Sequence, residues 1–307
     1  MAIVVDARTG HPLTLPAHCL FGRSSACSPR IEDPRVSGEH ARITWLGEAW
    51  ELKDLGSRNG TFLNGHKLDR GGAALLSVSD RIALGDDSIS FSVLDLSPPV
   101  AQARSLSSSR ILQASSAVLA LPSPDSPDVS IFEDADGQWR LEHDGDVEIT
   151  SDGAVIDVAG EAFMLHLPAP VTPTIDASFG PPDVRSLALG FRVSLDEERV
   201  EVTALIRGDR HVIPPRAHHY TWLTLARRMQ EDTTQAKLPD ASRGWLSIPD
   251  LCRMLAIDEN KLNVDFFRIR QDVGSLGLQT PASIIERRRG SRQARLGTSQ
   301  LTIDVLS

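Results

Sequence analysis

Apolar positions in the first 96 residues form short stretches that are separated by Gly, Asn, Asp and Pro. Ala2–Val5, Ala41–Trp45, Ala49–Leu52 and Ser88–Leu94 are four of these stretches. Strands this short and this frequent are typical of an antiparallel sandwich. We therefore predict an all-β sandwich domain over residues 1–96.

The pattern changes over residues 97–130. Nine Ser and five Pro fall between Ser97 and Asp128, which is the composition of a linker. Within this stretch, Ile111–Leu121 is apolar enough to dock as one strand or one short helix. We predict a Ser/Pro-rich linker over residues 97–130 that contains this docked segment.

Strand-like stretches return over residues 131–176. The dipeptides Asp136-Gly137, Asp144-Gly145 and Asp152-Gly153 between them suit tight hairpins. Residues 97–182 hold 13 acidic and 3 basic residues, so the negative charge of the chain is concentrated there. We predict a small acidic β module over residues 131–176 and assign it no chemistry.

Helical periodicity appears over residues 183–307. Two strand-like stretches, Ser186–Val193 and Arg199–Ile206, come first, and a helix is predicted over His218–Gln230. Ser247 and Asp250 have capping-box spacing at the start of a second helix. A third helix is predicted from an Asp258 cap to about Val273, followed by a basic hairpin and the strand-like stretch Gln300–Val305. The predicted fold class is therefore α+β, with several domains.

Few features of the sequence favour an enzyme, a secreted protein or a membrane protein. The three cysteines form no CxxC pair, which favours a reducing compartment. No signal peptide begins the chain, and no apolar stretch approaches the roughly 20 residues of a membrane helix. We expect a cytoplasmic protein that does not associate with a membrane.

Catalytic motifs are also missing from the sequence. It has neither a phosphate-binding glycine loop with a Lys nor a G-x-S-x-G turn. His218 and His219 are candidate metal ligands or acid–base groups, but no Cys, Asp or Glu completes a ligand set at the usual spacing. We expect these two histidines to flank the first helix, and we expect no catalytic residue, no metal and no cofactor.

Two polar segments of the predicted sandwich have the groups that a phosphate dianion needs, which are several convergent donors and at least one cation. Arg23 follows a Gly, and its planar guanidinium suits phosphate oxygens. Ser37 offers a hydroxyl on one turn. Arg58 and Asn59 lie on a second turn, between Gly56 and Gly60, which permit a tight backbone path.

Three blocks, Phe21–Arg23, Val36–Ile43 and Trp50–Gly65, resemble in order the GR, SxxH and (S/T)xNGTxxNG signature of the forkhead-associated (FHA) domain. The resemblance implies a phosphothreonine-binding sandwich with a pocket for the threonine methyl group. It implies that Arg23 and Ser37 contact the phosphate and that Asn59 grips the ligand backbone. The implied phosphopeptide contacts are Arg23, Ser37, Gly38, Ser57, Arg58 and Asn59, and the implied framework residues are Gly22, His40, Gly60, Thr61, Asn64 and Gly65.

Two of these positions differ from the usual pattern of the family. The residue after the signature serine often contributes a side chain, and here it is Gly38, which leaves only its backbone. Arg58 stands where the family usually has a small polar or basic contact, so it is a candidate to compensate for that loss.

The C-terminal region resembles the winged-helix effector domain of bacterial response regulators. The matching segments are Trp222–Arg228, Leu251–Leu255, Leu262–Arg270 and a hairpin from Ile284 to Leu296. At 100° per residue, Leu262, Phe266, Ile269 and Val273 share an apolar face. Asp265 and Asp272 are acidic residues of the same segment, and they count against DNA binding by it. The resemblance implies a DNA-reading helix and an Arg-rich wing. The expected DNA contacts are Lys261, Val264, Arg268, Arg270, Gln271, Arg287, Arg288, Arg289 and Arg292.

Together the two resemblances predict a phosphothreonine-dependent transcription regulator with double-stranded DNA as one partner. The other partner would be a protein phosphorylated on threonine by an upstream Ser/Thr kinase. The alternative is a phosphorylation-dependent adaptor whose winged helix binds protein rather than DNA.

Overall fold

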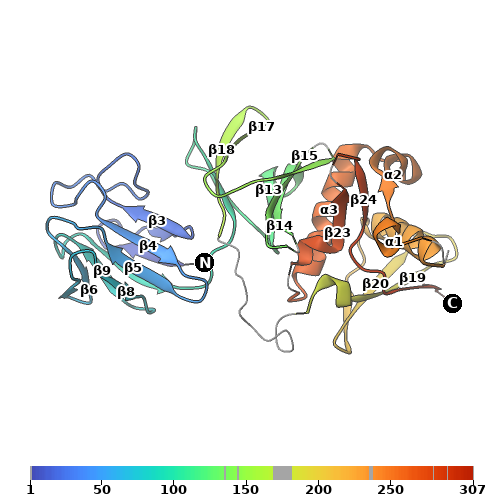
Figure 1. Cartoon of the computed structure of the whole chain (residues 1–307), viewed down its shortest axis with the longest axis horizontal. Helices are drawn as coiled ribbons and strands as arrows, with labels where there is room; N and C mark the ends of the chain where they lie inside the picture. The colour runs from blue at the N-terminus through green and yellow to red at the C-terminus, as the bar shows by residue number, and fades with distance from the viewer. Residues whose placement is uncertain are drawn as a thin grey trace. The chain divides into compact units, whose positions relative to one another are not determined.

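The computed structural model describes residues 2–134, 136–143, 145–168, 182–234, 238–278, 280–288 and 290–306. The chain divides into two compact units. The first comprises residues 1–102 and 166–169, and the second comprises residues 103–165 and 170–307. Figure 1 shows strands of the first unit in blue and the helices of the second in orange.

The first unit is a β-sandwich, as predicted. One sheet has the strand order β2-β1-β10-β9-β6-β7 and the other β3-β4-β5-β8. The strands are β1 (Ile3–Asp6), β2 (Pro12–Thr14), β3 (His18–Phe21), β4 (Ala41–Trp45), β5 (Trp50–Asp54), β6 (Thr61–Leu63), β7 (His66–Lys67), β8 (Ala73–Leu75), β9 (Arg81–Leu84) and β10 (Ser90–Asp95). All of their pairings are antiparallel.

The core of the sandwich lies between the two sheets. Alternate residues of β5 are buried, and Trp50 and Leu52 point inward. Phe21 from one sheet meets Phe91 from the other edge to face, with ring centroids 5.2 Å apart. This packing fixes the strands whose connecting turns form the candidate site.

Residues 97–130 do not form the linker that their Ser and Pro content predicted. They contribute β11 (Gln102–Ser105), β12 (Ile111–Gln113), β13 (Val118–Ser123) and the start of β14 (Ser126–Glu133). Val118–Leu121 is a continuous buried run, while most of the Ser residues lie at exposed positions. A short apolar run bounded by turn residues was enough to specify a strand.

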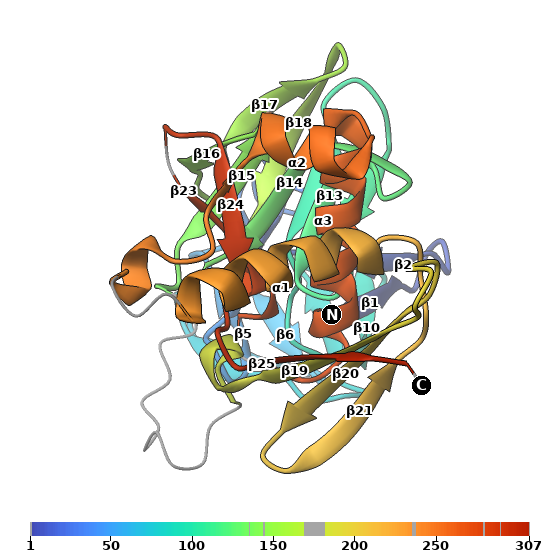
Figure 2. The ribbon, with the colours of Figure 1, turned by 90° about the vertical axis from the view of Figure 1, so that its right-hand side faces the viewer.

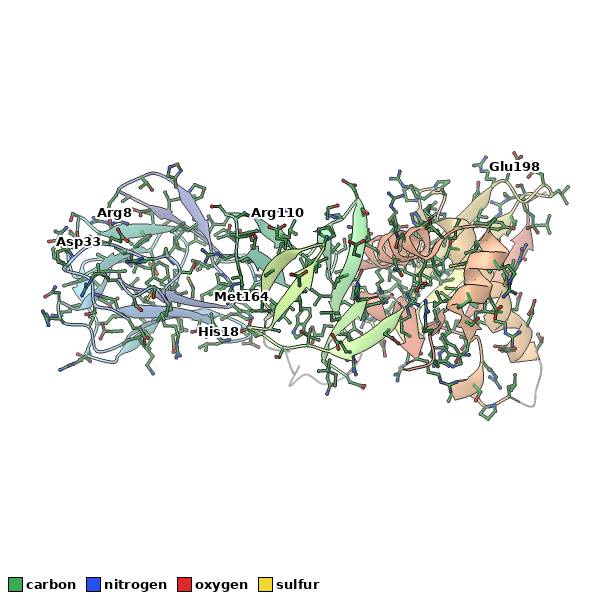
Figure 3. The ribbon with its side chains drawn as sticks, turned by 90° about the horizontal axis from the view of Figure 1, so that it is seen from above. Arg8, His18, Asp33, Arg110, Met164 and Glu198 are labelled. Atoms are coloured by element: carbon green, nitrogen blue, oxygen red, sulfur yellow. The ribbon has the colours of Figure 1, made fainter. Side chains whose placement is uncertain are left out.

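The predicted acidic β module is accordingly larger than expected. β13 and β14 join β15 (Trp139–His143) and β16 (Asp146–Ile149) in one antiparallel sheet, which we call the β13–β16 sheet. β11 and β12 join β17 (Val155–Val158) and β18 (Glu161–His166) in another. Figure 3 labels Arg110 and Met164 in this region. The end of the predicted module, residues 169–176, lies outside the described residues.

The rest of the second unit combines a sheet with three α-helices. β19 (Ala188–Val193), β20 (Val200–Ile206), β21 (Asp209–Ile213) and β25 (Leu301–Val305) form the sheet, in which β25 runs parallel to β19. The helices are α1 (His219–Thr234), α2 (Ile248–Leu255) and α3 (Glu259–Gly274). The remaining elements are β22 (Leu246–Ser247), β23 (Ile285–Arg288), β24 (Gln293–Leu296) and the 3-10 turns Val184–Ser186, Asp240–Ser242 and Pro281–Ile284.

The helix boundaries agree with the predicted caps. The Ser247 side chain accepts a hydrogen bond from the Asp250 N–H, and the Asp258 side chain accepts one from the Lys261 N–H. Figure 2 shows α1 crossing this unit beside β24 and β20. Leu262, Phe266, Ile269 and Val273 point from α3 into the core, on the face that the helical periodicity predicted.

α3 also packs on a second side. Phe267 is buried in a separate apolar cluster with Val118, Ala120, Phe132 and Ala282, so the β13–β16 sheet lies against the flank of this helix. Among the described residues, no helix is long and apolar enough to cross a bilayer.

Candidate functional site

Two turns of the sandwich are tied together by one buried histidine. The Ser37 N–H donates to His40 Nδ1 (3.0 Å), and His40 Nε2 lies 3.0 Å from the Gly60 carbonyl oxygen. Since Nδ1 accepts, the ring proton belongs on Nε2, which donates to Gly60. Burial lowers the pKa of His40, although its bond to Gly60 opposes the shift. A neutral imidazole thus fixes the first turn against the second.

The predicted phosphate contacts lie next to this histidine. The Arg58 N–H donates to Ser37 Oγ (3.1 Å), and the Asn59 amide donates to the Arg35 carbonyl oxygen (2.8 Å). The Arg23 N–H donates to the Ser37 carbonyl oxygen (3.0 Å), which places Arg23 beside the first turn. The structure therefore brings Arg23, Ser37, Arg58 and Asn59 together.

The charged groups of Arg23 and Arg58 are exposed to solvent. The contact of the Arg23 guanidinium is a long one, from Nε to the Val36 carbonyl oxygen (3.4 Å). Arg23 is exposed, and its backbone is bonded to that of Ser37. This arrangement can present a guanidinium, a hydroxyl and the neighbouring backbone N–H groups to one anion.

Asp54 organises the second turn, and the sequence analysis missed it. Its carboxylate accepts from the N–H groups of Gly56 (2.8 Å) and Gly71 (3.2 Å) and from the hydroxyls of Ser57 (2.6 Å) and Thr61 (2.7 Å). Burial works against its charge, but these bonds lower the pKa of Asp54 to about 2. An Asp two residues before a Gly and three before a Ser is an Asx-turn signal that was available in the sequence.

Ser57 was predicted to contact the ligand, and in the structure it also takes part in the hydrogen bonds of the second turn. The side chain is buried, its hydroxyl donates to Asp54, and the same oxygen accepts from the Gly60 N–H (3.0 Å). These bonds shape the turn, and Ser57 also lines the pocket beside it, so its contact with the ligand stays a prediction. Thr61 is likewise buried and bonded to Asp54, as a framework residue would be.

Gly22 is needed where two backbone segments approach closely, and Gly60 is needed for a left-handed backbone conformation. A Cβ on Gly22 would lie 2.2 Å from the Gly38 carbonyl oxygen, and Gly60 has a φ of +94°. Asn64, with a φ of +51°, bonds through its amide to Asp80 (2.7 Å) and to the Arg81 N–H (2.8 Å). Gly65 follows with a φ of +80°, which suits the same turn. Gly38 is exposed, so its backbone is accessible at the edge of the site.

A pocket of about 500 Å³ adjoins the second turn. Ser37, Arg58 and Gly60 line one part of it, and Lys67 and Arg70 line another. Both of these cations are exposed, and the sequence analysis had given neither a role. Arg35, also near the first turn, is instead paired with Asp33 (2.8 Å). Figure 3 labels Asp33 and Arg8 at one end of the sandwich.

Residues 19–85 match the family model of the FHA domain. The chain carries an FHA domain. The chain is 37% identical over 71 residues to protein phosphatase 2C 70 of Arabidopsis thaliana and 35% identical over 69 residues to FhaB of Mycobacterium tuberculosis. Each match covers 22% of this chain, but only 12% of the phosphatase and 44% of FhaB. The chain thus spans less than half the length of either relative.

Solved structures with similarity to this chain include Mycobacterium tuberculosis EmbR in complex with a low-affinity phosphopeptide. The identity is 25% and the TM-score is 0.28, and the match covers 32% of this chain and 25% of EmbR.

Outside the FHA domain, two of the expected DNA contacts are buried, so that prediction is wrong for them. Arg270 is 0% exposed, and its Nη2 lies 2.8 Å from Glu142 Oε2. Arg287 Nε donates to Glu142 Oε1 (2.8 Å), and its guanidinium lies over the Phe266 ring. Burial opposes the charge of Glu142, but the two cations lower its pKa to about 2. Long-range pairing with β15 has taken both arginines away from solvent.

The other expected DNA contacts have mixed surroundings. Two of the cations are neutralised by neighbouring carboxylates, since Lys261 pairs with Asp265 and Arg292 pairs with Glu259. Arg268 is exposed, and Arg288 is exposed with its guanidinium 5.1 Å from the Trp245 ring centroid. Val264 and Gln271 are half-buried on α3, and Arg289 lies outside the described residues.

Proposed function

We propose that this protein binds phosphothreonine peptides through its FHA domain and so responds to a Ser/Thr kinase. The observation that carries the proposal is the pair of hydrogen bonds by which His40 joins the Ser37 turn to the Gly60 turn. Two further hydrogen bonds support the proposal, from the Arg58 N–H to Ser37 Oγ and from the Arg23 N–H to the Ser37 carbonyl oxygen. In this proposal the protein is a binder rather than an enzyme.

The charges at the site support a dianionic ligand. Arg23, Arg58, Lys67 and Arg70 are exposed around the two turns, and the nearest buried carboxylate, Asp54, is already saturated by hydrogen bonds. A phosphate ester carries nearly two negative charges at neutral pH and accepts several hydrogen bonds. The preference for threonine over serine rests on the FHA resemblance, and a buried methyl group adds only about 0.8 kcal/mol.

The test is peptide binding by the full chain. A degenerate phosphothreonine peptide library is screened, and the affinity of a selected peptide is measured by fluorescence anisotropy. We expect Arg23→Ala to weaken binding roughly 10- to 100-fold, because it removes charge-assisted hydrogen bonds worth about 1.5–3 kcal/mol. The dephosphorylated peptide is expected not to bind.

Arg42→Ala is the matched control, because Arg42 is an exposed arginine on β4 outside the two turns. It is expected to bind as the unaltered protein does. Equal affinities for Arg23→Ala and Arg42→Ala, with both variants folded by circular dichroism, would rule out the proposed phosphate contact.

For the second unit we propose the adaptor role, in which the helical region binds protein. The ion pairs of Lys261, Arg270, Arg287 and Arg292 with acidic side chains favour this role, because they leave little positive charge on α3 and the hairpin. The transcription-regulator role is the second candidate, and the exposed Arg268 and Arg288 favour it.

Salt dependence separates the two roles. A protein that neutralises several DNA phosphates loses orders of magnitude in affinity as salt rises. We expect no binding of the full chain to a random-sequence duplex pool at low salt, with or without the phosphothreonine peptide. Salt-sensitive binding that Arg268→Ala weakens would instead establish the DNA-binding role.

A further inference from the structure

Three side chains that the FHA domain does not use converge at the junction of α1 and α3. His218 directly precedes α1, His219 is its first residue, and Asp272 lies near the end of α3. One nitrogen of each ring and a carboxylate oxygen all lie within 4.8 Å of one another. We call these three residues the His–Asp cluster. Its carboxylate comes from 53 or 54 residues away, which is why local spacing did not reveal it.

The two rings differ in how they meet Asp272. His218 Nε2 is 2.6 Å from Asp272 Oδ2, which is a hydrogen bond. His219 Nε2 is 3.6 Å from the same oxygen and has no hydrogen-bond partner among the described residues, although the side chain is 0% exposed. A buried polar atom without a partner is costly, so this nitrogen indicates a missing ligand.

The other nitrogen of His219 shows which kind of ligand fits. His219 Nδ1 lies 3.4 Å from the Val200 carbonyl oxygen, which can only accept a hydrogen. With the proton on Nδ1, the Nε2 lone pair points at the negatively charged oxygen of Asp272. A cation between the two removes this repulsion. Histidine ligands of metals commonly donate their second N–H to a backbone carbonyl in this way.

The spacing and the surroundings suit a zinc-class ion. Zinc bonds to histidine nitrogen and carboxylate oxygen are about 2.0–2.2 Å, so tetrahedral ligand atoms lie roughly 3.3–3.5 Å apart. The 3.6 Å separation at His219 matches, and the 2.6 Å separation at His218 must open when a metal replaces the hydrogen bond. Trp222 packs edge-on against the His219 ring, and the partly exposed Asp272 gives access to the cluster.

The geometry points to a zinc-class metal site in which His218 Nε2, His219 Nε2 and Asp272 Oδ2 are three ligands and water is the fourth. Such an ion would link the start of α1 to the end of α3. Its role would be structural, because metal bound only by the folded state adds to folding stability.

The experiment uses the full chain after dialysis against EDTA. One equivalent of Co²⁺ is added, and the visible absorption of four-coordinate Co²⁺ is recorded before and after Zn²⁺ displaces it. We expect one Zn²⁺ per chain and a higher unfolding temperature with Zn²⁺ than with EDTA. Asp272→Asn and His219→Gln are expected to weaken Zn²⁺ binding at least about 100-fold.

His211→Gln and Asp304→Asn are the controls, because both side chains are exposed on strands of the same unit. They are expected to bind Zn²⁺ within about twofold of the unaltered chain, as surface changes away from a site do. Circular dichroism confirms folding, and Asp272→Asn keeps a hydrogen-bond acceptor for His218 in case His219→Gln does not fold. Absence of four-coordinate Co²⁺ absorption in the unaltered chain, or full Zn²⁺ binding by Asp272→Asn, would overturn the assignment.

Discussion

His40 shows how a single protonation state can support the phosphopeptide site. Its Nδ1 can accept from the Ser37 N–H only while the ring is neutral, and burial lowers its pKa below the ordinary value of 6.5. The unfolded chain therefore takes up this proton more readily than the folded one. The stability that His40 contributes is fully present above about pH 6.5 and is lost as pH falls through the folded pKa.

The first prediction follows from the lowered pKa of His40 in the folded state. Phosphopeptide affinity and the unfolding temperature of the FHA domain should both fall as pH is lowered from about 7 to about 5. His40→Asn should lower both values at pH 7 and flatten the pH dependence of the unfolding temperature, whereas the affinity keeps the dependence that comes from the second pKa of the phosphate, about 6. Anisotropy titrations and thermal melts across this range provide the measurement, with the exposed His66→Gln as control. A His40→Asn variant whose unfolding temperature keeps the full pH dependence would show that another group is responsible.

At the scale of elements, the sequence predicted the helix starts and turns, because these are decided by interactions between residues close together in the chain. The Ser247 and Asp258 caps placed the starts of α2 and α3, and the glycines placed the turns of the FHA domain. Within residues 97–130, the apolar segment Ile111–Leu121 was expected to dock, and it forms β12 and most of β13. β11 and the start of β14 were missed, because Ser and Pro dominate the composition of the stretch.

The contacts between the flank of α3 and the β13–β16 sheet were missed, because they depend on residues far away in the sequence. Arg270 was expected to contact DNA, but it pairs with Glu142, which lies 128 residues away in the sequence. Nothing in the periodicity of α3 specifies that partner. The candidate phosphate contacts could be predicted because their motif fixes both turns at once, whereas the roles of Lys67 and Arg70 emerged only from the folded arrangement.

The second prediction concerns the two ion pairs that Glu142 on β15 makes, one with Arg270 on α3 and one with Arg287 on β23. Glu142→Gln leaves Arg270 and Arg287 buried without their carboxylate, and breaking a buried pair in this way costs about 3–5 kcal/mol. The unfolding temperature of the second unit should therefore fall clearly. Glu148→Gln, an exposed carboxylate on the adjacent strand β16, should change stability by less than about 0.5 kcal/mol. The free energy of unfolding of both variants is measured by chemical denaturation. Equal values for Glu142→Gln and Glu148→Gln would show that the two ion pairs make no net contribution to stability.

At the scale of the whole molecule, two hydrophobic cores share no residue. One core holds the FHA domain, and the other holds the three helices with the sheet of β19, β20, β21 and β25. Separate cores of this kind favour separate unfolding transitions, because each core can lose its packing without the other. A ligand that binds one unit raises the unfolding temperature of that unit, so its effect shows which transition belongs to which unit.

The last prediction uses that linkage in differential scanning calorimetry of the full chain. We expect two transitions, and a phosphothreonine peptide at about 100 times its Kd should stabilise only the FHA transition, by about 2.7 kcal/mol. For a domain of roughly 100 residues this corresponds to a rise of about 10 °C or more. Glu142→Gln should lower only the other transition. Arg23→Ala should reduce the stabilisation by the same peptide concentration to about 0.4–1.4 kcal/mol, without moving either midpoint of the peptide-free protein. A single transition that responds to both the peptide and Glu142→Gln would show that the two cores unfold as one cooperative body, and binding at the FHA domain would then be coupled to the stability of the helical unit.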